Sequence, residues 1–199
     1  GVAGGYLRQL TRYSAVFALI SDVCLGVMGG SLKRREKITG RLADALSWMY
    51  MASAAIKRFN DEGRPAADEA YLKWSCDKAL WEIQEALRGV IDNFPMRLLA
   101  WKMRWLIFPW GMRRRPPADE LGGEIAASLL DGNEGRDRLT GDIYIPSSDE
   151  DGLGTLEATL EKVVTAQPAA RKIKSALRDG TLTGKPSDTL YDEALTQGI

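Results

Sequence analysis

The sequence predicts an all-α protein: a helical bundle of about seven or eight helices with a short extended connector. Apolar residues recur at spacings of three and four through most of the chain, which indicates helices with one buried face. Glycine and proline clusters interrupt this pattern and mark the turns between helices. With 199 residues, 45% of them apolar, the chain is long enough to bury a substantial core.

Three long helices are predicted in the first half of the chain. The first covers about residues 6–27 and ends at Gly29-Gly30. Ser31 is a candidate N-cap for the second helix, which extends to about residue 60, and the third covers about 67–92 after the turn DEGRP. The side chains expected to face inward are Leu7, Leu10, Tyr13, Phe17, Ile20 and Cys24 in the first helix, Ile38, Leu42, Ala45, Leu46, Met49 and Ala52 in the second, and Tyr71, Trp74, Leu80, Ile83, Leu87 and Val90 in the third.

A fourth, shorter helix is predicted over residues 95–108. Pro95 suits its first turn, and Pro109 disfavours its continuation. Its length of roughly 20 Å is below the roughly 30 Å hydrocarbon thickness of a bilayer, so it is too short to cross a membrane. Two faces are expected, an apolar one with Met96, Leu99, Ala100, Met103, Leu106 and Ile107, and an aromatic one with Trp101, Trp105 and Phe108, while Arg97 and Arg104 lie on the flank.

This helix and the residues after it admit two main interpretations. Both faces can be buried in the bundle with the arginines extending to water, as is usual for helices that are apolar all round. Alternatively, the Met/Leu face packs on protein and the aromatic face meets anionic lipid headgroups, a zone that tryptophan and arginine favour. A contact with an acyl chain or a nucleotide phosphate is a third alternative. The candidate contacts with a membrane or another anion are Trp101, Arg104, Trp105, Trp110, Arg113, Arg114 and Arg115.

The last third of the chain is predicted to hold shorter helices. After Pro116-Pro117, a helix is expected over 118–130 and a further helical turn over 133–139. The stretch DIYIPSSDEDG is expected to be an extended acidic connection, with a hinge at 146–152. The closing helices are predicted at about 153–166, 168–178 and 187–196.

Charge divides the chain at Pro117. Residues 1–117 hold 19 Lys and Arg against 11 Asp and Glu, a net charge of +8, and residues 118–199 hold 8 against 16, a net charge of −8. All six tryptophans lie in the first part. We therefore expect a basic, tryptophan-rich helical domain (1–117) and a smaller acidic helical segment (118–199) packed on it. Nucleic acid is not expected as a partner, because neither a known reader motif nor a basic-aromatic repeat occurs.

The composition excludes several kinds of chemistry. The chain has no histidine, which removes Ser-His and Cys-His nucleophiles and the usual zinc or iron ligands. Cys24 and Cys76 lie far apart without metal-ligand spacing, and no glycine motif for dinucleotides or phosphates occurs. No catalytic or metal-binding residue is therefore predicted, and no segment is expected to span a bilayer alone.

Four segments carry a resemblance to a known family. They read GGSLKRREKITGRLADALSWMYMASAAIKRFNDEGR, NFPMRLLAWKMRWLIFPWG, GRDRLTGDIYIP and DEALTQGI. In this order, and over nearly the entire chain, they resemble the C-terminal region of large bacterial acyl-CoA dehydrogenases of fatty-acid β-oxidation. LKRRE with the following RLADALS, and the later NFP and IYIP, are the most specific parts. The segment with Trp110, Met112 and residues 113–115 is expected to vary within that family.

The resemblance implies a parent enzyme that oxidises acyl-CoA to trans-2-enoyl-CoA, with a glutamate as base and FAD as hydride acceptor. That glutamate and the flavin core belong upstream, so no residue here takes either role and FAD is not expected in this chain alone. We expect an accessory C-terminal piece of a homodimeric enzyme, whose partners are the upstream catalytic part and acyl-CoA. The expected location is the cytoplasm, peripheral on the inner membrane. By analogy with the helical extension of very-long-chain acyl-CoA dehydrogenases, the piece aids membrane association or subunit architecture, and the alternative is a purely structural, dimerising module without membrane contact.

Lys33, Arg34 and Arg35 are candidates for an interface or a phosphate contact. They are predicted in the first turns of the second helix, where cations oppose the macrodipole, so local stability does not explain them. Carboxylates of a neighbouring helix or subunit, CoA phosphates and lipid are the candidate partners. A solvated basic face is an equal alternative.

Overall fold

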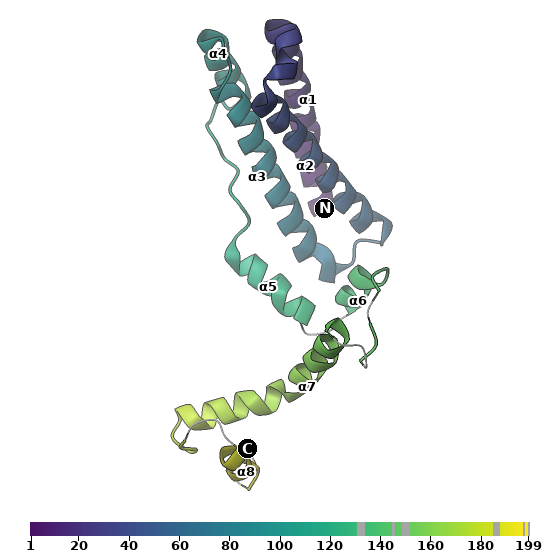
Figure 1. The fold of residues 1–199 in the computed structure, drawn as a ribbon, viewed down its shortest axis with the longest axis vertical. Helices are drawn as coiled ribbons and strands as arrows, with labels where there is room; N and C mark the ends of the chain where they lie inside the picture. Colours follow the sequence, from purple (N-terminus) through teal and green to yellow (C-terminus); the bar gives the residue numbers. More distant parts are fainter. Residues whose placement is uncertain (131–133, 145, 149–151, 185–187, 197, 199) are drawn as a thin grey trace. The chain divides into compact units, whose positions relative to one another are not determined.

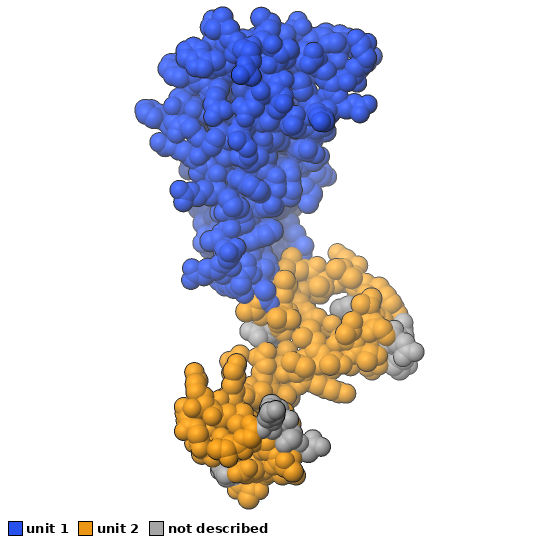
Figure 2. Space-filling model, turned by 60° about the vertical axis from the view of Figure 1, so that its left-hand side comes forward, with its two compact units in different colours: residues 1–126 blue, residues 127–199 orange. Residues whose placement is uncertain are grey.

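The protein is helical throughout its regular structure. A computed structural model describes residues 1–130, 134–144, 146–148, 152–184, 188–196 and 198. These residues form eight α-helices and two 3₁₀ helices without a strand, which confirms the predicted all-α class (Figure 1). Two compact units divide the chain, unit 1 with residues 1–126 and unit 2 with residues 127–199 (Figure 2). The predicted domain boundary at Pro117, and the packing of the acidic part on the basic part, stay predictions.

Unit 1 is built on three long helices that run alternately up and down. They are α1 (Val2–Met28), α2 (Glu36–Asp61) and α3 (Glu69–Asp92), which lie side by side in Figure 1. A short 3₁₀ helix, η2 (Ala66–Asp68), precedes α3, and α4 (Arg97–Ile107) folds back onto the end of α3. Because α3 contacts α1, α2 and α4, it is the central element of the unit.

The core of unit 1 lies on α3. Four of its predicted inward residues are fully buried, Leu80, Ile83, Leu87 and Val90. The face also includes Leu72, Cys76, Ala79, Gln84 and Ile91, and the small side chains among these let the neighbouring helices approach closely. The prediction for Trp74 is wrong, because this side chain is 37% exposed at the edge of the face.

Gly89 is a second point of close approach on α3. A Cβ added there would lie 2.7 Å from both Cδ and Nε of Arg41 on α2. The absence of a side chain at residue 89 therefore leaves room for the Arg41 chain to lie across α3.

Of the residues predicted to face inward on α1 and α2, Leu7 and Leu46 are 46% and 54% exposed, so those two predictions are wrong. Both helices bury a narrower stripe than the broad apolar face expected from their sequences.

The connection between α1 and α2 differs from the prediction. Gly29 adopts a φ of +47° and the chain continues as a 3₁₀ helix, η1 (Gly29–Arg34). The Ser31 hydroxyl donates to the Met28 carbonyl oxygen at 2.7 Å. Ser31 is thus engaged at the end of α1 and is not the N-cap of α2, which begins at Glu36. The hydroxyl has satisfied a backbone group of the preceding helix instead of the following one.

The segment Val2–Arg34 is long and apolar enough to cross a membrane by length and composition, and only 17% of its most apolar window is buried. The sequence has no charge-free apolar run of about 18 residues, and the expectation that no segment spans a bilayer alone stays a prediction. The window tolerates a charged residue such as Asp22, whereas the expectation required a run without charge. Core helices of soluble proteins meet the same criteria of length and composition, so we assign no span.

The C-terminal helices are α5 (Asp119–Leu130), α6 (Glu134–Thr140), α7 (Leu153–Arg178) and α8 (Asp188–Thr196). Two helices predicted at 153–166 and 168–178 form the single helix α7, with Pro168 inside it. Proline removes one backbone hydrogen bond but does not end a helix whose flanking residues favour it. A small core of unit 2 consists of Ala176, Leu182, Leu190 and Ala194. The predicted elements that include residues 133, 145, 149–151 and 187 lie partly outside the described residues.

Candidate functional site

The outward face of α4 exposes several large apolar side chains. Helix α4 is about 17 Å long and buries Met103 and Ile107, while Leu99 and Ala100 are half-buried. Its opposite side carries residues at spacings of three and four, which therefore share one face. We call these residues the α4 surface: Leu98 (68% exposed), Trp101 (64%), Lys102, Trp105 (68%) and Leu106 (62%).

The α4 surface corrects part of the predicted pattern. Met96 and Leu106 were expected on the buried face but are 51% and 62% exposed. Phe108 was expected on the aromatic face but is half-buried against the core. Met96 precedes the helix and Phe108 follows it, so neither obeys the helical period, whereas Leu106 lies within α4 and belongs to its exposed face. Within the described chain, the two tryptophans of α4 are not core residues.

Arg104 has a partner inside the chain. Its Nη1 donates to Oδ1 of Asp92 at 2.9 Å, and both side chains are about half exposed. Pairs of this kind contribute about 0–1 kcal/mol, so the contact orients α4 against the end of α3 more than it stabilises the fold. Arg104 was predicted as an anion contact, and the structure places it in this ion pair.

The end of α4 and the segment after it, residues 107–115, are attached to the bundle at two places. Gln84 on α3 is 2% exposed, and its amide makes two hydrogen bonds with the backbone of Arg114. The Arg114 amide donates to Oε1 at 3.0 Å, and Nε2 donates to the Arg114 carbonyl at 3.2 Å. On α1, Nη2 of Arg12 donates to the Ile107 carbonyl at 3.2 Å. This segment is therefore held against both α1 and α3.

The attached segment closes a cavity of about 240 Å³ against α1. Three arginines line it, Arg12, Arg113 and Arg114, and the Arg113 guanidinium lies over the Trp110 ring at 5.8 Å from its centroid. The remaining lining residues are aromatic, aliphatic or neutral: Gln9, Tyr13, Val16, Gln84, Ile107, Phe108, Pro109, Trp110 and Gly111. The sequence-based candidates 110, 113 and 114 are thus brought together, whereas Arg115 is exposed and does not line the cavity.

Sequence reasoning missed Arg12, Tyr13 as a cavity residue, and Gln84. Gln84 could have been found, because it is an amide within the apolar face of α3, and a buried amide requires hydrogen-bond partners. Arg12 gave no comparable signal, since an arginine on a long helix is usually solvated.

The basic residues 33–35 lie on the η1 turn. Lys33 and Arg34 are in the last turn of η1, and Arg35 precedes α2. All three are exposed. The prediction that they lie in the first turns of the second helix is wrong, because α2 begins at Glu36. Arg35 is the N-cap residue of α2, so these cations still lie at the positive end of its macrodipole, and their role as an interface or phosphate contact stays a prediction.

Three groups on α1 and α3, Tyr6, Cys24 and Cys76, have altered acidity. The Tyr6 hydroxyl donates to Oδ1 of Asp77 at 3.0 Å, and burial together with this carboxylate raises the pKa of Tyr6 well above its usual value. Burial, and next the charge of Asp77, raise the pKa of the Cys76 thiol to about 12. Burial also raises the pKa of Cys24. These thiols stay protonated and inert at neutral pH.

The unfolding free energy is expected to fall between pH 8 and pH 10. An unfolded thiol loses its proton from about pH 9, whereas the native Cys76 keeps it, so this stabilisation is complete below pH 9 and is lost as the pH rises towards 12. Cys76 alone is expected to lower the free energy of unfolding by about 1 kcal/mol at pH 10. Urea unfolding at both pH values, with Cys76→Ala as the comparison, measures this. Equal losses in the two proteins would contradict the assignment.

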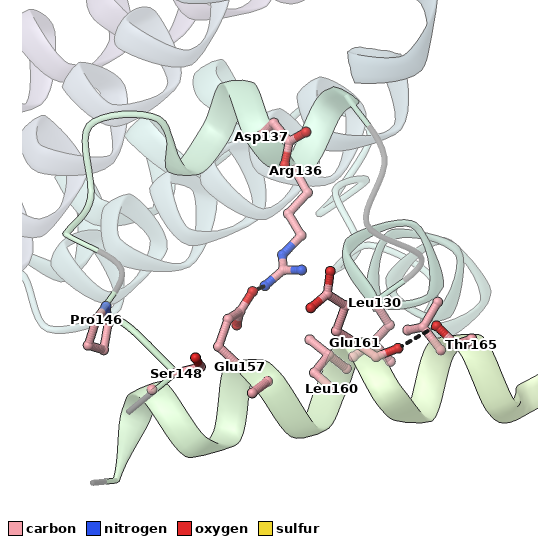
Figure 3. Close-up of a pocket in the computed structure, with 12 residues that line it drawn as sticks. Leu130, Arg136, Asp137, Pro146, Ser148, Glu157, Leu160, Glu161 and Thr165 are labelled. Carbon is pink, nitrogen blue, oxygen red and sulfur yellow. Dashed lines mark hydrogen bonds and ion pairs between the residues drawn. The ribbon is translucent and has the colours of Figure 1, made fainter. Parts of the chain in front are cut away.

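Unit 2 has a cavity of a different character. It encloses about 450 Å³ beside α7, and Arg136 pairs there with Glu157, which it faces in Figure 3. The carboxylates of Asp137 and Glu161 also line it, and the Thr165 hydroxyl donates to the Glu161 carbonyl at 2.9 Å. In the part of the chain that the structure describes, no group of His, Cys, Asp or Glu side chains has the arrangement of a metal site.

Neither of these two cavities suits a flavin dinucleotide. The carboxylates of the unit 2 cavity would repel its pyrophosphate. The unit 1 cavity carries cations but, at about 240 Å³, is smaller than the roughly 300–1,000 Å³ of pockets for drug-sized ligands. We therefore derive no step of an FAD reaction from these residues.

These features define a helical domain that presents an apolar surface and a cationic cavity, which is typical of an accessory or interaction module. A family model described as "Acyl-CoA dehydrogenase, C-terminal, bacterial type" matches residues 2–199. The chain therefore belongs to this family, the C-terminal domain of bacterial-type acyl-CoA dehydrogenases, as the resemblance of its four segments predicted. No solved structure matches the chain.

Proposed function

We propose that this chain is the accessory domain of an FAD-dependent enzyme that oxidises acyl-CoA to trans-2-enoyl-CoA in β-oxidation, and that it holds this enzyme at an anionic membrane surface on the cytoplasmic side. Membership of the family supports the link to the enzyme. FAD and acyl-CoA are assigned to the upstream catalytic part. The observation that carries the membrane role is the α4 surface, with Trp101 and Trp105 about two-thirds exposed.

The α4 surface has the chemistry of an interfacial contact. Tryptophan is enriched at the boundary between headgroups and acyl chains, where its ring is buried and its N–H stays hydrated. Lys102 lies on the same face, and Arg115 is exposed on the segment that follows. Each basic residue near an anionic leaflet contributes about 1 kcal/mol, so the cations add to the burial of the rings.

Membrane association also suits the proposed substrate. Long-chain acyl-CoA thioesters partition into membranes, so an enzyme at the surface meets a higher local concentration of substrate than an enzyme in solution. Because the interaction combines burial with charge, it is expected to weaken with salt without disappearing.

Flotation with vesicles tests this proposal. The chain is expected to float with vesicles that contain an anionic lipid, and the Trp101→Gln/Trp105→Gln variant is expected to lose at least about tenfold in partitioning, since two exposed rings no longer enter the interface. The matched control is Leu46→Gln/Tyr50→Gln, which removes two exposed apolar side chains at the same spacing on α2. An equal loss of partitioning in both variants would refute the assignment to α4. Failure of the parent chain to float with the anionic vesicles would refute it as well.

A second candidate function is a dimerising module without membrane contact. The exposed apolar residues of α1, among them Leu19 (39%) and Leu25 (57%), favour it, because a second subunit could cover them. Sedimentation of the chain over a range of concentrations distinguishes the two functions. A dimer that Leu19→Gln/Leu25→Gln converts to a monomer, in a protein that does not bind vesicles, would favour the structural function.

A further inference from the structure

The cavity between α1 and residues 108–114 has features of a ligand site that the proposed membrane function does not use. We propose that it binds the phosphoryl group of a small molecule or a lipid headgroup. Arg12 and Arg113 supply the charge, and the aromatic wall receives the attached organic part. The proposal is independent of the α4 surface, because none of the residues of that surface lines the cavity.

The charge of the cavity is not balanced by its own walls. Arg12, Arg113 and Arg114 line it, and no carboxylate does. Within the described part of the chain, none of the three guanidinium groups forms a salt bridge. The carboxylate of Asp77, on the neighbouring face of α3, accepts a hydrogen bond from Tyr6 and does not reach the cavity lining. Three cations without a counter-charge favour an anion between them.

The arginines are held in place before any ligand arrives. Arg12 uses one N–H on the Ile107 carbonyl, which fixes its guanidinium at the mouth and leaves its other donors available. The backbone of Arg114 is fixed by its two hydrogen bonds with Gln84. Arg113 rests on the Trp110 ring. Preorganisation of this kind lowers the entropy that a ligand loses on binding.

The number of donors favours phosphate over a carboxylate. Guanidinium groups match phosphate oxygens in pairs, and several of them around one tetrahedral anion can each take a different oxygen. A single carboxylate has only two oxygens and one charge. The volume of about 240 Å³ exceeds what a phosphate alone fills, so Val16, Phe108 and Trp110 are left to contact an organic group.

Titration of the 199-residue chain with defined probes tests the proposal. The probes are inorganic phosphate, glycerol 3-phosphate, and dihexanoyl-phosphatidylglycerol below its micelle concentration, each followed by calorimetry at constant ionic strength with chloride as the reference. We expect saturable binding of the phosphorylated probes and none of chloride. Glycerol 3-phosphate is expected to bind more tightly than inorganic phosphate, because its organic part contacts the aromatic wall. Tightest binding by the short lipid would identify a headgroup, and tightest binding by glycerol 3-phosphate a soluble ligand.

Substitutions locate the site. Arg113→Gln is expected to weaken phosphate binding about tenfold, since it removes a charge-assisted contact. Arg115→Gln, on an exposed neighbour outside the cavity, is expected to leave it unchanged. Glycerol 3-phosphate at a concentration that saturates the parent should raise the Tm of the parent and of Arg115→Gln by more than it raises that of Arg113→Gln. Arg12→Lys, which keeps a cation, is expected to retain part of the affinity.

The opposite results would overturn the phosphate site. Equal weakening by Arg113→Gln and Arg115→Gln would show diffuse attraction by the basic segment. Binding of the phosphorylated probes that does not saturate would show that the cavity is no specific anion site and that its arginines serve only to attach residues 108–115 to the bundle. Intact phosphate binding in Trp101→Gln/Trp105→Gln, with vesicle flotation lost, is instead the expected result, because the α4 surface does not line the cavity.

Discussion

Replacing Gln84 with Ala is expected to lower the free energy of unfolding by about 2–4 kcal/mol and to release residues 108–115 from the bundle. Gln84 is 2% exposed and supplies both partners of the Arg114 backbone. Its loss leaves an amide and a carbonyl of the attached segment unpaired and opens a cavity in the centre of α3. Urea unfolding measures the change in stability.

Limited proteolysis measures the release itself. Trypsin is expected to cut the peptide bonds after Arg113 and Arg114 much faster in Gln84→Ala than in the parent, because cleavage requires an extended, detached backbone. Gln167→Ala is the matched control, since the Gln167 amide on α7 accepts a hydrogen bond from Arg171 at the surface. Cleavage at the same rate in Gln84→Ala and the parent would mean that the segment is held elsewhere.

Leu80→Ala is expected to destabilise the chain by about 2–5 kcal/mol. Leu80 is fully buried on α3, where α1 and α2 also pack, so the surrounding helices can relax only partly into the space left by the side chain. Urea unfolding at neutral pH, with an unchanged m-value as evidence for the same native state, measures this effect.

Leu98→Ala is the control for Leu80→Ala. Leu98 lies on the α4 surface and is 68% exposed, so its truncation is expected to change the free energy of unfolding by less than about 0.5 kcal/mol. A loss similar to that of Leu80→Ala, together with a dependence on protein concentration, would show that a second copy covers the α4 surface in solution.

The helices of unit 1 could be predicted because the spacing of three and four between their apolar residues is a property of each short stretch of sequence. Four of the six inward residues predicted on α3 are fully buried. The C-terminal ends of α3 and α4 lie within two residues of their predicted positions. The start of α2 was missed, because Ser31 can serve the helix before it or the helix after it, and only the three-dimensional course of the chain decides between them. Pro168 was read as a boundary for a related reason, since a proline interrupts a helix or only bends it according to its surroundings.

The candidate site could be predicted in part. The aromatic and basic residues of 101–115 were found from composition, yet the structure separates them into three groups: the exposed tryptophans of α4, the ion pair of Arg104 with Asp92, and the cavity cluster at 110–114. Arg12 belongs to that cluster although it precedes Arg113 by most of the length of unit 1. Periodicity describes one helix at a time, so it cannot show which distant helix supplies the opposite wall.

Pro168 gives α7 a property that the other helices of unit 2 lack. Without an amide hydrogen, residue 168 leaves the carbonyl one turn earlier, that of Val164, without its helical donor, and α7 changes direction along its length (Figure 1). Bending at this point costs no further helical hydrogen bond, so α7 is expected to bend more easily at Pro168 than elsewhere along its length. Substitution of Pro168 with Ala would restore the missing bond and stiffen the helix there.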